Sequence, residues 1–264
     1  MSNSEYQDLQ VVLLAGGLGT RIREETESRP KPMIEIGGRP LLWHLMKYFS
    51  TFGLSDFVVC TGYKAEVIVD YFTNFNLHNN DFTIDMSSHN SVTVHNSNFQ
   101  EPWKVTIAHT GGPNVGTGGR LNRVRKYVKS DNFICTYGDG LSDIQIPTLI
   151  KAHLNNGGVA TVTVTKPTNR FGVVEMDNAL VTSFREKPQA EGWINSGYFV
   201  FNQKIWDYLD DECTLEESPM KRLSKEGSLF GYEHLGFWQA MDTYREYQLL
   251  EGLWAENRAP WRIW

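Results

Sequence analysis

The chain has 264 residues, of which 41% are apolar and 21% charged, and its net charge is −6. This composition predicts a globular protein with a sizeable core, and the acidic balance argues against a nucleic-acid-binding protein, which usually carries a basic face. Cys60, Cys135 and Cys213 are far apart in the sequence, which argues against a disulfide framework or a zinc site. The first residues lack the pattern of a signal peptide, and no apolar run is long enough to span a membrane. We therefore expect a cytoplasmic protein with no membrane partner.

Strands and helices alternate in the first part of the chain. Residues 10–14 form a buried strand that runs into a glycine-rich loop, and residues 40–52 have the apolar spacing of a helix. A second buried strand at 56–61 and a helix at 63–74 follow. This alternation predicts an α/β fold with a doubly wound, mostly parallel sheet.

Two stretches break the rhythm with short, alternating β segments. They predict a β insertion at about 77–110 and a β-rich lobe at about 166–202. Between them, helices and strands are expected at 119–130, 132–136, 146–156 and 159–165. The C-terminal part is expected to be mostly helical, with a tryptophan-rich tail. No composition break marks a linker, so we treat residues 1–264 as a single domain.

The glycine-rich loop after the first strand is the first candidate site. It comprises Leu14, Ala15, Gly16, Gly17, Gly19, Thr20 and Arg21. Glycines let the backbone approach a phosphate, and successive N–H groups form an anion-binding concavity. Doubly wound sheets bind nucleotides at this position. The loop matches neither GxGxxG nor the Walker A pattern, and an ordinary glycine-rich turn is the alternative.

Lys31 is the second candidate, because Pro30 and Pro32 fix the backbone on either side of it. A lysine held in this way suits a point-charge contact with a phosphate. The alternative is a solvated lysine in a proline-rich loop.

The motifs GGLGTR, RPKPMIEIGGRPLL, YGDG, FGVVE, REKP, INSGYFVF and FWQAMDT follow one another along the chain. In this order they resemble the sugar-nucleotide pyrophosphorylases, nucleotidyltransferases that act on sugar 1-phosphates. Four stretches are most similar to the branch that uses CTP and glucose 1-phosphate: residues 101–106, 117–124, 234–246 and the ending EGLWAENRAPWRIW.

The resemblance implies roles for individual residues. The glycine-rich loop would cradle the triphosphate, while Arg21 and Lys31 would offset charge on the α-phosphate and the leaving pyrophosphate. Asp139 and Asp242 would hold Mg²⁺, with Asp143 a weaker third candidate. The alternatives are a turn aspartate at Asp139 and a helix N-cap at Asp242.

The sugar and the base are assigned to other segments. The resemblance implies that Gly172, Glu186, Lys187 and Asn195 contact the sugar phosphate, and Ser196 stands where relatives often have glycine. Gly118, Gly119 and Arg120 would read the base. An arginine can donate to O2 and N3 of cytosine, whereas a backbone carbonyl can accept from N4. A helix-surface arginine is the alternative for Arg120.

Several alternatives stay open at this point. The chain could instead transfer a uridylyl or thymidylyl group, or use another phosphorylated acceptor. It could also be a catalytically silent binding subunit, although its retained set of charged residues argues against this: Arg21, Lys31, Asp139, Lys187 and Asp242. The resemblance implies a homo-oligomer, with a hexamer as one candidate, that supplies CDP-glucose for deoxysugars of surface polysaccharide. Apolar surface around Trp254, Trp261 and Trp264 also favours an oligomer over a monomer.

Overall fold

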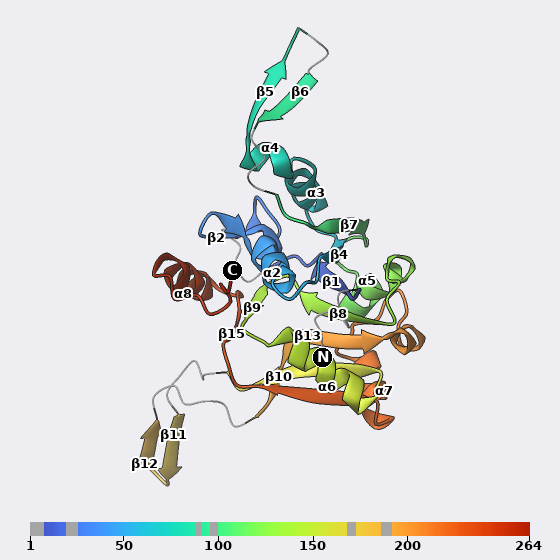
Figure 1. Ribbon diagram of the computed structural model, residues 1–264. Helices are drawn as coiled ribbons and strands as arrows, with labels where there is room; N and C mark the ends of the chain where they lie inside the picture. The colour runs from blue at the N-terminus through green and yellow to red at the C-terminus, as the bar shows by residue number, and fades with distance from the viewer. Residues whose placement is uncertain (1–7, 20–25, 88–90, 96–99, 168–172, 186–191) are drawn as a thin grey trace.

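The computed structural model describes residues 8–19, 26–87, 91–95, 100–167, 173–185 and 192–264 (Figure 1). Within these ranges the central sheet has seven strands in the order β14-β10-β13-β8-β1-β4-β7. They are β14 (Leu229–His234), β10 (Ala160–Thr165), β13 (Ile194–Asn202), β8 (Asn132–Tyr137), β1 (Gln10–Ala15), β4 (Asp56–Thr61) and β7 (Lys104–His109). All neighbours are parallel except β13, which is antiparallel to both β8 and β10. The predicted mostly parallel, doubly wound sheet is confirmed.

The central strand β1 explains how the sheet is covered. Its side chains alternate between two apolar cores: Val11 and Leu13 face one core, and Val12 and Leu14 face the other. The first core receives α2 (Leu41–Ser50), α3 (Ala65–Thr73), α6 (Ile146–Asn156) and α8 (Tyr244–Ala255). The second receives α5 (Thr117–Arg123), η4 (Gln203–Tyr208) and α7 (Ser218–Lys225). Because both faces are covered, β1 is a continuous apolar run.

The predicted β insertion is partly wrong. After α4 (Phe75–Asn79), β5 (Asp81–Asp85) and β6 (Ser91–His95) form a separate hairpin that projects away from the central sheet (Figure 1). Residues 104–109, however, form β7, an edge strand of the central sheet that pairs in parallel with β4. An edge strand is only partly covered, so its sequence alternates like that of an insertion.

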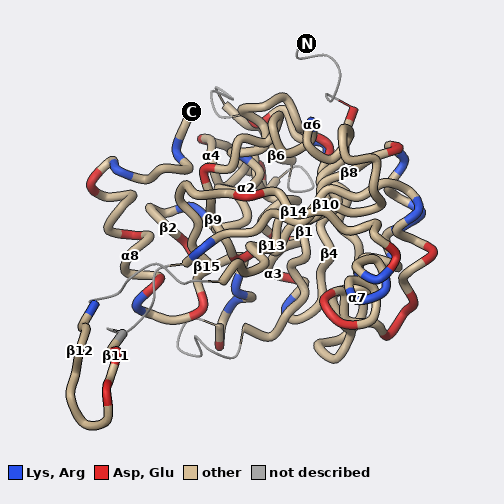
Figure 2. Tube along the Cα trace, turned by 90° about the horizontal axis from the view of Figure 1, so that it is seen from below, with Lys and Arg blue, Asp and Glu red and all other residues tan. Residues whose placement is uncertain are grey.

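The boundary of the β-rich lobe is wrong for a similar reason. β11 (Val173–Asp177) and β12 (Leu180–Arg185) form a second projecting hairpin, visible in Figures 1 and 2. Residues 194–202 are instead β13, a central strand buried from Ser196 to Phe201. Residues 194–202 therefore belong to the central sheet, although the sequence predicted them to be part of the lobe.

The C-terminal part contains more than helices. Besides α7 and α8 it supplies the edge strand β14 and the short β15 (Trp238–Ala240), which pairs with β9 (Gly140–Ser142). β14 mixes apolar and polar residues and is only partly buried, and β15 has three residues, so neither gives a clear periodic signal and the sequence predicted helix here. The remaining short elements are η2 (Lys31–Met33), β2 (Glu35–Ile36), β3 (Arg39–Pro40) and η3 (Arg125–Tyr127).

The tryptophan-rich tail packs on its own subunit. Trp261 is 0% exposed, and its indole Nε1 lies 3.4 Å from Nδ1 of His44 in α2. The Trp254 ring packs edge-on against the His44 ring, and the Trp264 ring lies tilted beside it. Trp261 is therefore covered by its own chain and Trp254 is half-buried, whereas Trp264 stays 36% exposed, so part of the apolar surface on which the oligomer expectation rested remains. No helix in the described ranges is long and apolar enough to cross a membrane.

Candidate active site

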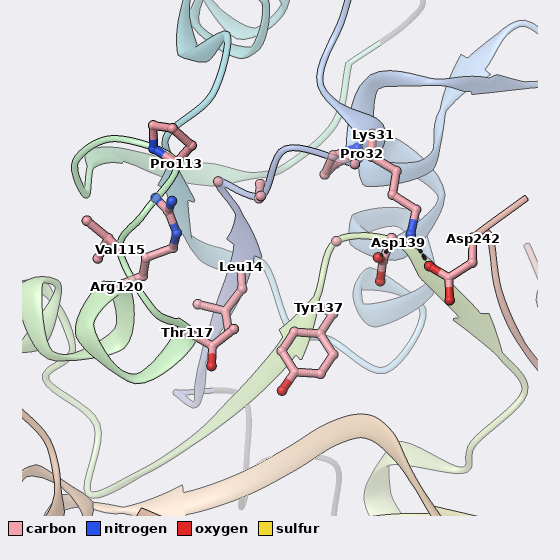
Figure 3. Close-up of a pocket in the computed structure, with 15 residues that line it drawn as sticks. Leu14, Lys31, Pro32, Pro113, Val115, Thr117, Arg120, Tyr137, Asp139 and Asp242 are labelled. Atoms are coloured by element: carbon pink, nitrogen blue, oxygen red, sulfur yellow. Dashed lines mark hydrogen bonds and ion pairs between the residues drawn. The ribbon is translucent and has the colours of Figure 1, made fainter. Parts of the chain in front are cut away.

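A cavity of ≈ 300 Å³ lies where β1 and β8 end side by side (Figure 3). Such a position, outside the carboxyl ends of parallel strands, is where doubly wound sheets bind ligands. The N–H of Gly138 donates to the carbonyl of Leu14 at 3.0 Å, which joins the turn after β8 to the end of β1. The lining residues are Leu14, Ala15, Gly16, Gly17, Gly19, Lys31, Pro32, Pro113, Val115, Thr117, Arg120, Tyr137, Gly138, Asp139 and Asp242.

Residues of the glycine-rich loop form one wall of this cavity. A Cβ atom on Gly16 would lie 2.2 Å from Nη1 of Arg120, so a side chain here would force the buried guanidinium to move. Gly19 has a φ of +61°, a conformation that favours glycine. Gly17 faces open space. Thr20 and Arg21 lie outside the described residues.

Lys31 reaches the opposite side of the cavity, where its ammonium contacts two carboxylates. Its Nζ donates to Oδ2 of Asp139 at 2.7 Å and to Oδ1 of Asp242 at 2.6 Å. The residue is only 7% exposed. Burial acts to lower the pKa of the Lys31 ammonium, but the two carboxylates raise it above its ordinary value. The solvated-lysine alternative is therefore excluded.

The pairing of β9 with β15 brings the two carboxylates together. Gly140 lies opposite Ala240, and the N–H of Met241 donates to the carbonyl of Asp139 at 2.9 Å. Asp139 and Asp242 flank this pairing and so project into the same cavity (Figure 3).

Asp242 is not the N-cap of α8. Thr243 is the N-cap, in a reciprocal capping box with Glu246. The carboxylate of Glu246 also accepts from the N–H of Asp242 at 2.7 Å. The side chain of Asp242 is thus directed to the cavity while Glu246 and Thr243 satisfy the start of the helix.

Two convergent carboxylates fit the protein's share of a Mg²⁺ site. Magnesium is usually bound through one or two carboxylates, with water and substrate phosphates completing its six ligands. In the described part of the chain, no group of three or more His, Cys, Asp or Glu side chains could hold a metal ion. Asp143, the third candidate, does not line the cavity and contacts Nε2 of His234 at 3.0 Å instead.

Arg120 lines the cavity beside the glycine-rich loop but is only 3% exposed. Its guanidinium donates to Oγ1 of Thr110 at 3.0 Å and to the carbonyl of Gly112 at 2.7 Å. Burial lowers the pKa of this guanidinium from its ordinary value. Arg120 is therefore not a helix-surface arginine, and it holds the 110–112 segment against the cavity wall.

Gly118 and Gly119 do not line the cavity. Cβ atoms there would lie 2.4 Å from Sγ of Cys213 and 2.4 Å from the carbonyl oxygen of Asp211, respectively. These glycines let α5 approach the 211–215 segment closely, and the N–H of Gly119 donates to the carbonyl of Cys213 at 2.9 Å. Helix packing accounts for both glycines.

The predicted sugar contacts fall mostly outside the described residues, which is the case for Gly172, Glu186 and Lys187. Asn195 is exposed, and its Oδ1 accepts from the N–H of Gly197 at 2.7 Å. Ser196 is buried and donates to the carbonyl of Thr163 at 2.9 Å. Ser196 is therefore directed into the sheet, toward β10.

Sequence reasoning missed Tyr137, the last residue of β8. Its ring lines the cavity and packs against Gly197, where a Cβ atom would lie 2.4 Å from the Tyr137 ring. Its buried hydroxyl has no hydrogen-bond partner within the described residues. Its place at the end of a strand, immediately before the Gly138–Asp139 turn, was the available signal. Pro113 and Val115 were also missed, because they lie on a loop with no motif, and Thr117, the first residue of α5, was not singled out within the 117–124 stretch.

Comparison with known proteins agrees with this geometry. The nucleotidyl transferase family matches residues 10–229. A protein named glucose-1-phosphate cytidylyltransferase from Salmonella typhi is 48% identical over 97% of this chain and 100% of its own length. A probable glucose-1-phosphate cytidylyltransferase from Bacillus subtilis is 37% identical over the same shares.

A solved structure agrees at the level of the fold. HddC from Yersinia pseudotuberculosis superposes with a TM-score of 0.68 at 25% identity, covering 93% of this chain and 99% of that one. The family match, the sequence identities and the shared fold all assign the chain to the same family. The chain belongs to the nucleotidyl transferase family and groups within it with the glucose-1-phosphate cytidylyltransferases.

Proposed function

We propose that the protein transfers the cytidylyl group of CTP to glucose 1-phosphate, giving CDP-glucose and pyrophosphate. The observation that carries this is the cavity at the ends of β1 and β8, where a glycine-rich loop faces Lys31, Asp139 and Asp242. Identity of 48% to a glucose-1-phosphate cytidylyltransferase supports the choice of CTP and glucose 1-phosphate.

The chemistry demands positioning more than covalent participation. A phosphate oxygen of glucose 1-phosphate attacks the α-phosphorus of CTP, a new P–O bond forms, and the bond to the leaving pyrophosphate breaks. Because the attacking oxygen is already anionic, no general base is required. The protein must align the two phosphates and offset their negative charge.

The described residues supply both functions. Gly16, Gly17 and Gly19 line the cavity, where backbone N–H groups of their loop would bind the triphosphate, and Lys31 provides a positive charge on the opposite side. Asp139 and Asp242 would hold Mg²⁺, which when bound offsets phosphate charge and orients the α-phosphate. Arg120 and the backbone carbonyls of the 110–112 segment that it holds would contact the cytosine base of CTP.

Other assignments extend beyond the described residues. We assign Thr20 and Arg21 to the phosphates and Gly172, Glu186, Lys187 and Asn195 to the sugar phosphate. Glu186 and Lys187 belong to the motif REKP, and the resemblance places this motif at the sugar phosphate. We treat residues 1–264 as one nucleotidyltransferase domain.

The test is pyrophosphate release with glucose 1-phosphate and Mg²⁺, comparing CTP, UTP, dTTP, ATP and GTP. Strong preference for CTP is expected. Release with UTP or dTTP instead would keep the catalytic assignments and overturn the choice of base. If no nucleotide gives release, screening of other sugar 1-phosphates distinguishes a different acceptor from a silent subunit.

The biological setting is a further part of the proposal. We place the enzyme in the cytoplasm, as a homo-oligomer that supplies CDP-glucose for deoxysugars of surface polysaccharide. The projecting β5–β6 hairpin supports an oligomer, since Phe82, Ile84, Val92 and Val94 share one face of it and all are exposed. Sedimentation of the purified chain tests this, and a monomer at micromolar concentration would contradict it.

A further inference from the structure

The ammonium of Lys31 occupies the position between the two carboxylates that suit a metal ion. Dashed lines in Figure 3 mark its contacts with Asp139 and Asp242, at 2.7 and 2.6 Å. Both carboxylates are about a quarter to a third exposed in the cavity, at 31% and 27%, whereas the Lys31 side chain is 9% exposed. Lys31 is thus the innermost member of the cluster.

The Lys31 ammonium offsets the repulsion between the two carboxylates. Two carboxylates that converge on one point repel each other, and a cation between them removes the repulsion. Lys31 supplies that cation from the chain itself. A divalent ion bound to the same two oxygens would have to approach the ammonium closely, and like charges at such a distance repel strongly in a partly buried site.

The backbone at Lys31 is restrained, while the side chain reaches across the cavity. Lys31 begins η2, with Pro30 before it and Pro32 after it, and η2 is buried. Its Cβ packs near Gly19 of the glycine-rich loop, 3.1 Å from where a Cβ atom on that glycine would lie. The stem of the side chain is therefore next to the loop that would hold phosphates, although its tip contacts the carboxylates.

We propose that Lys31 acts as a resident counter-ion that keeps a divalent cation from binding to Asp139 and Asp242 until a nucleoside triphosphate arrives. Phosphate oxygens of the nucleotide then accept hydrogen bonds from the Lys31 ammonium in place of the two carboxylates. Asp139 and Asp242 can now bind the divalent cation that arrives with the nucleotide. This inference rests on the proposed function of the same cavity. It adds that metal binding and nucleotide binding are coupled through one lysine, so the free enzyme binds metal poorly.

The test measures Mn²⁺ binding to the full chain without nucleotide, by the loss of the free-Mn²⁺ electron paramagnetic resonance signal. Lys31→Gln is expected to bind Mn²⁺ at least tenfold more tightly than the unaltered protein. Lys31→Arg keeps the positive charge and should bind as weakly as the unaltered protein. Lys104→Gln removes an exposed lysine paired with Asp56 at the edge of the sheet and serves as the control. Asp139→Asn added to Lys31→Gln should abolish the gain.

Equal or weaker Mn²⁺ binding by a folded Lys31→Gln variant overturns the inference. A second measurement covers the case in which this variant does not fold. Crystals of the unaltered protein soaked in Mn²⁺ should show no anomalous density at Asp139 and Asp242 without CTP, and density there with CTP. Density without CTP contradicts the inference.

These results separate the inference from the function on which it rests. Release of pyrophosphate with CTP, together with unchanged Mn²⁺ binding in Lys31→Gln, refutes the counter-ion role alone. Tighter Mn²⁺ binding in that variant, together with no pyrophosphate release by the unaltered protein from any nucleotide, refutes the proposed reaction and leaves the counter-ion role standing.

Discussion

Thr243 and Glu246 cap the start of α8 reciprocally, and the Glu246 carboxylate also accepts from the N–H of Asp242 at 2.7 Å. One side chain therefore fixes both the helix start and the backbone of a candidate metal ligand. The capping box is a common local motif, but here it determines where a carboxylate lies in the cavity.

Glu246→Ala is expected to lower kcat by roughly tenfold to a hundredfold, since small displacements of catalytic groups cost about this much. Stability should fall by only about 1 kcal/mol, the usual cost of a lost cap. Glu246→Gln keeps an acceptor oxygen and should retain most activity. Glu256→Ala, at an exposed ion pair with Arg258 at the far end of α8, is the control. Pyrophosphate release and thermal unfolding measure the two effects, and parallel losses in Ala and Gln variants would refute the positioning role.

Asp139→Asn and Asp242→Asn should each reduce turnover by at least about a hundredfold, because a neutral amide is a poor ligand for Mg²⁺ and offsets less charge. Each change also leaves Lys31 with one carboxylate partner. Asp143→Asn is the matched control, since Asp143 contacts His234 outside the cavity. Pyrophosphate release at saturating CTP measures the effect. Comparable losses in all three variants would mean that the cavity carboxylates have no special role.

Gly16→Ala and Gly17→Ala form a matched pair within one loop. The added methyl at Gly16 would lie 2.2 Å from the buried Arg120 guanidinium, whereas at Gly17 it would meet nothing within 4 Å. We expect Gly16→Ala to destabilise the free protein by roughly 1–3 kcal/mol, the range for overpacking. Gly17→Ala should unfold at the temperature of the unaltered protein. Calorimetry of the two variants without ligand measures the difference. Equal unfolding temperatures would contradict the close contact between Gly16 and the Arg120 guanidinium.

Two buried histidines predict a loss of stability in mild acid. Burial lowers the pKa of both His44 and His153 to about 4, from 6.5. Below pH 6.5 the unfolded chain binds protons that the folded chain excludes, so stability falls as the pH drops from 6.5 toward 4. Each histidine should cost about 2 kcal/mol at pH 5 relative to pH 7.5.

Urea unfolding at pH 7.5 and pH 5 measures this difference, and His44→Gln and His153→Gln should each reduce it. His153 is held by Thr161 and Asn132, so glutamine can replace part of its hydrogen bonding. The same pH dependence in the unaltered protein and both variants would show that other groups are responsible.

The sequence predicted the buried parallel strands well, because β1, β4 and β8 are apolar runs with clear flanking signals. It failed at the edges of the sheet. β7 and β14 have partly exposed, mixed sequences, and only their pairing with β4 and β10 identifies them as strands of the sheet. Edge strands depend on tertiary contacts that local periodicity does not record.

The candidate site divides in the same way. Gly16, Lys31 and Asp139 lie on or beside motifs and were found from the sequence together with Asp242. The sequence interpretation placed Gly118 and Gly119 at the nucleotide base. In the structure their lack of a side chain allows α5 to pack closely against the 211–215 segment. A glycine required for packing and a glycine required by a ligand look identical in a sequence.

The pairing of β9 with β15 has a consequence for synthesis of the chain. All seven strands of the central sheet precede residue 235, but Asp242 follows β15. A nascent chain that has exposed the whole sheet outside the ribosome therefore still lacks one carboxylate, and Lys31 has only Asp139 as a carboxylate partner in this pair. The catalytic centre is therefore complete only when the segment that follows the last sheet strand has been synthesised and β15 has paired with β9.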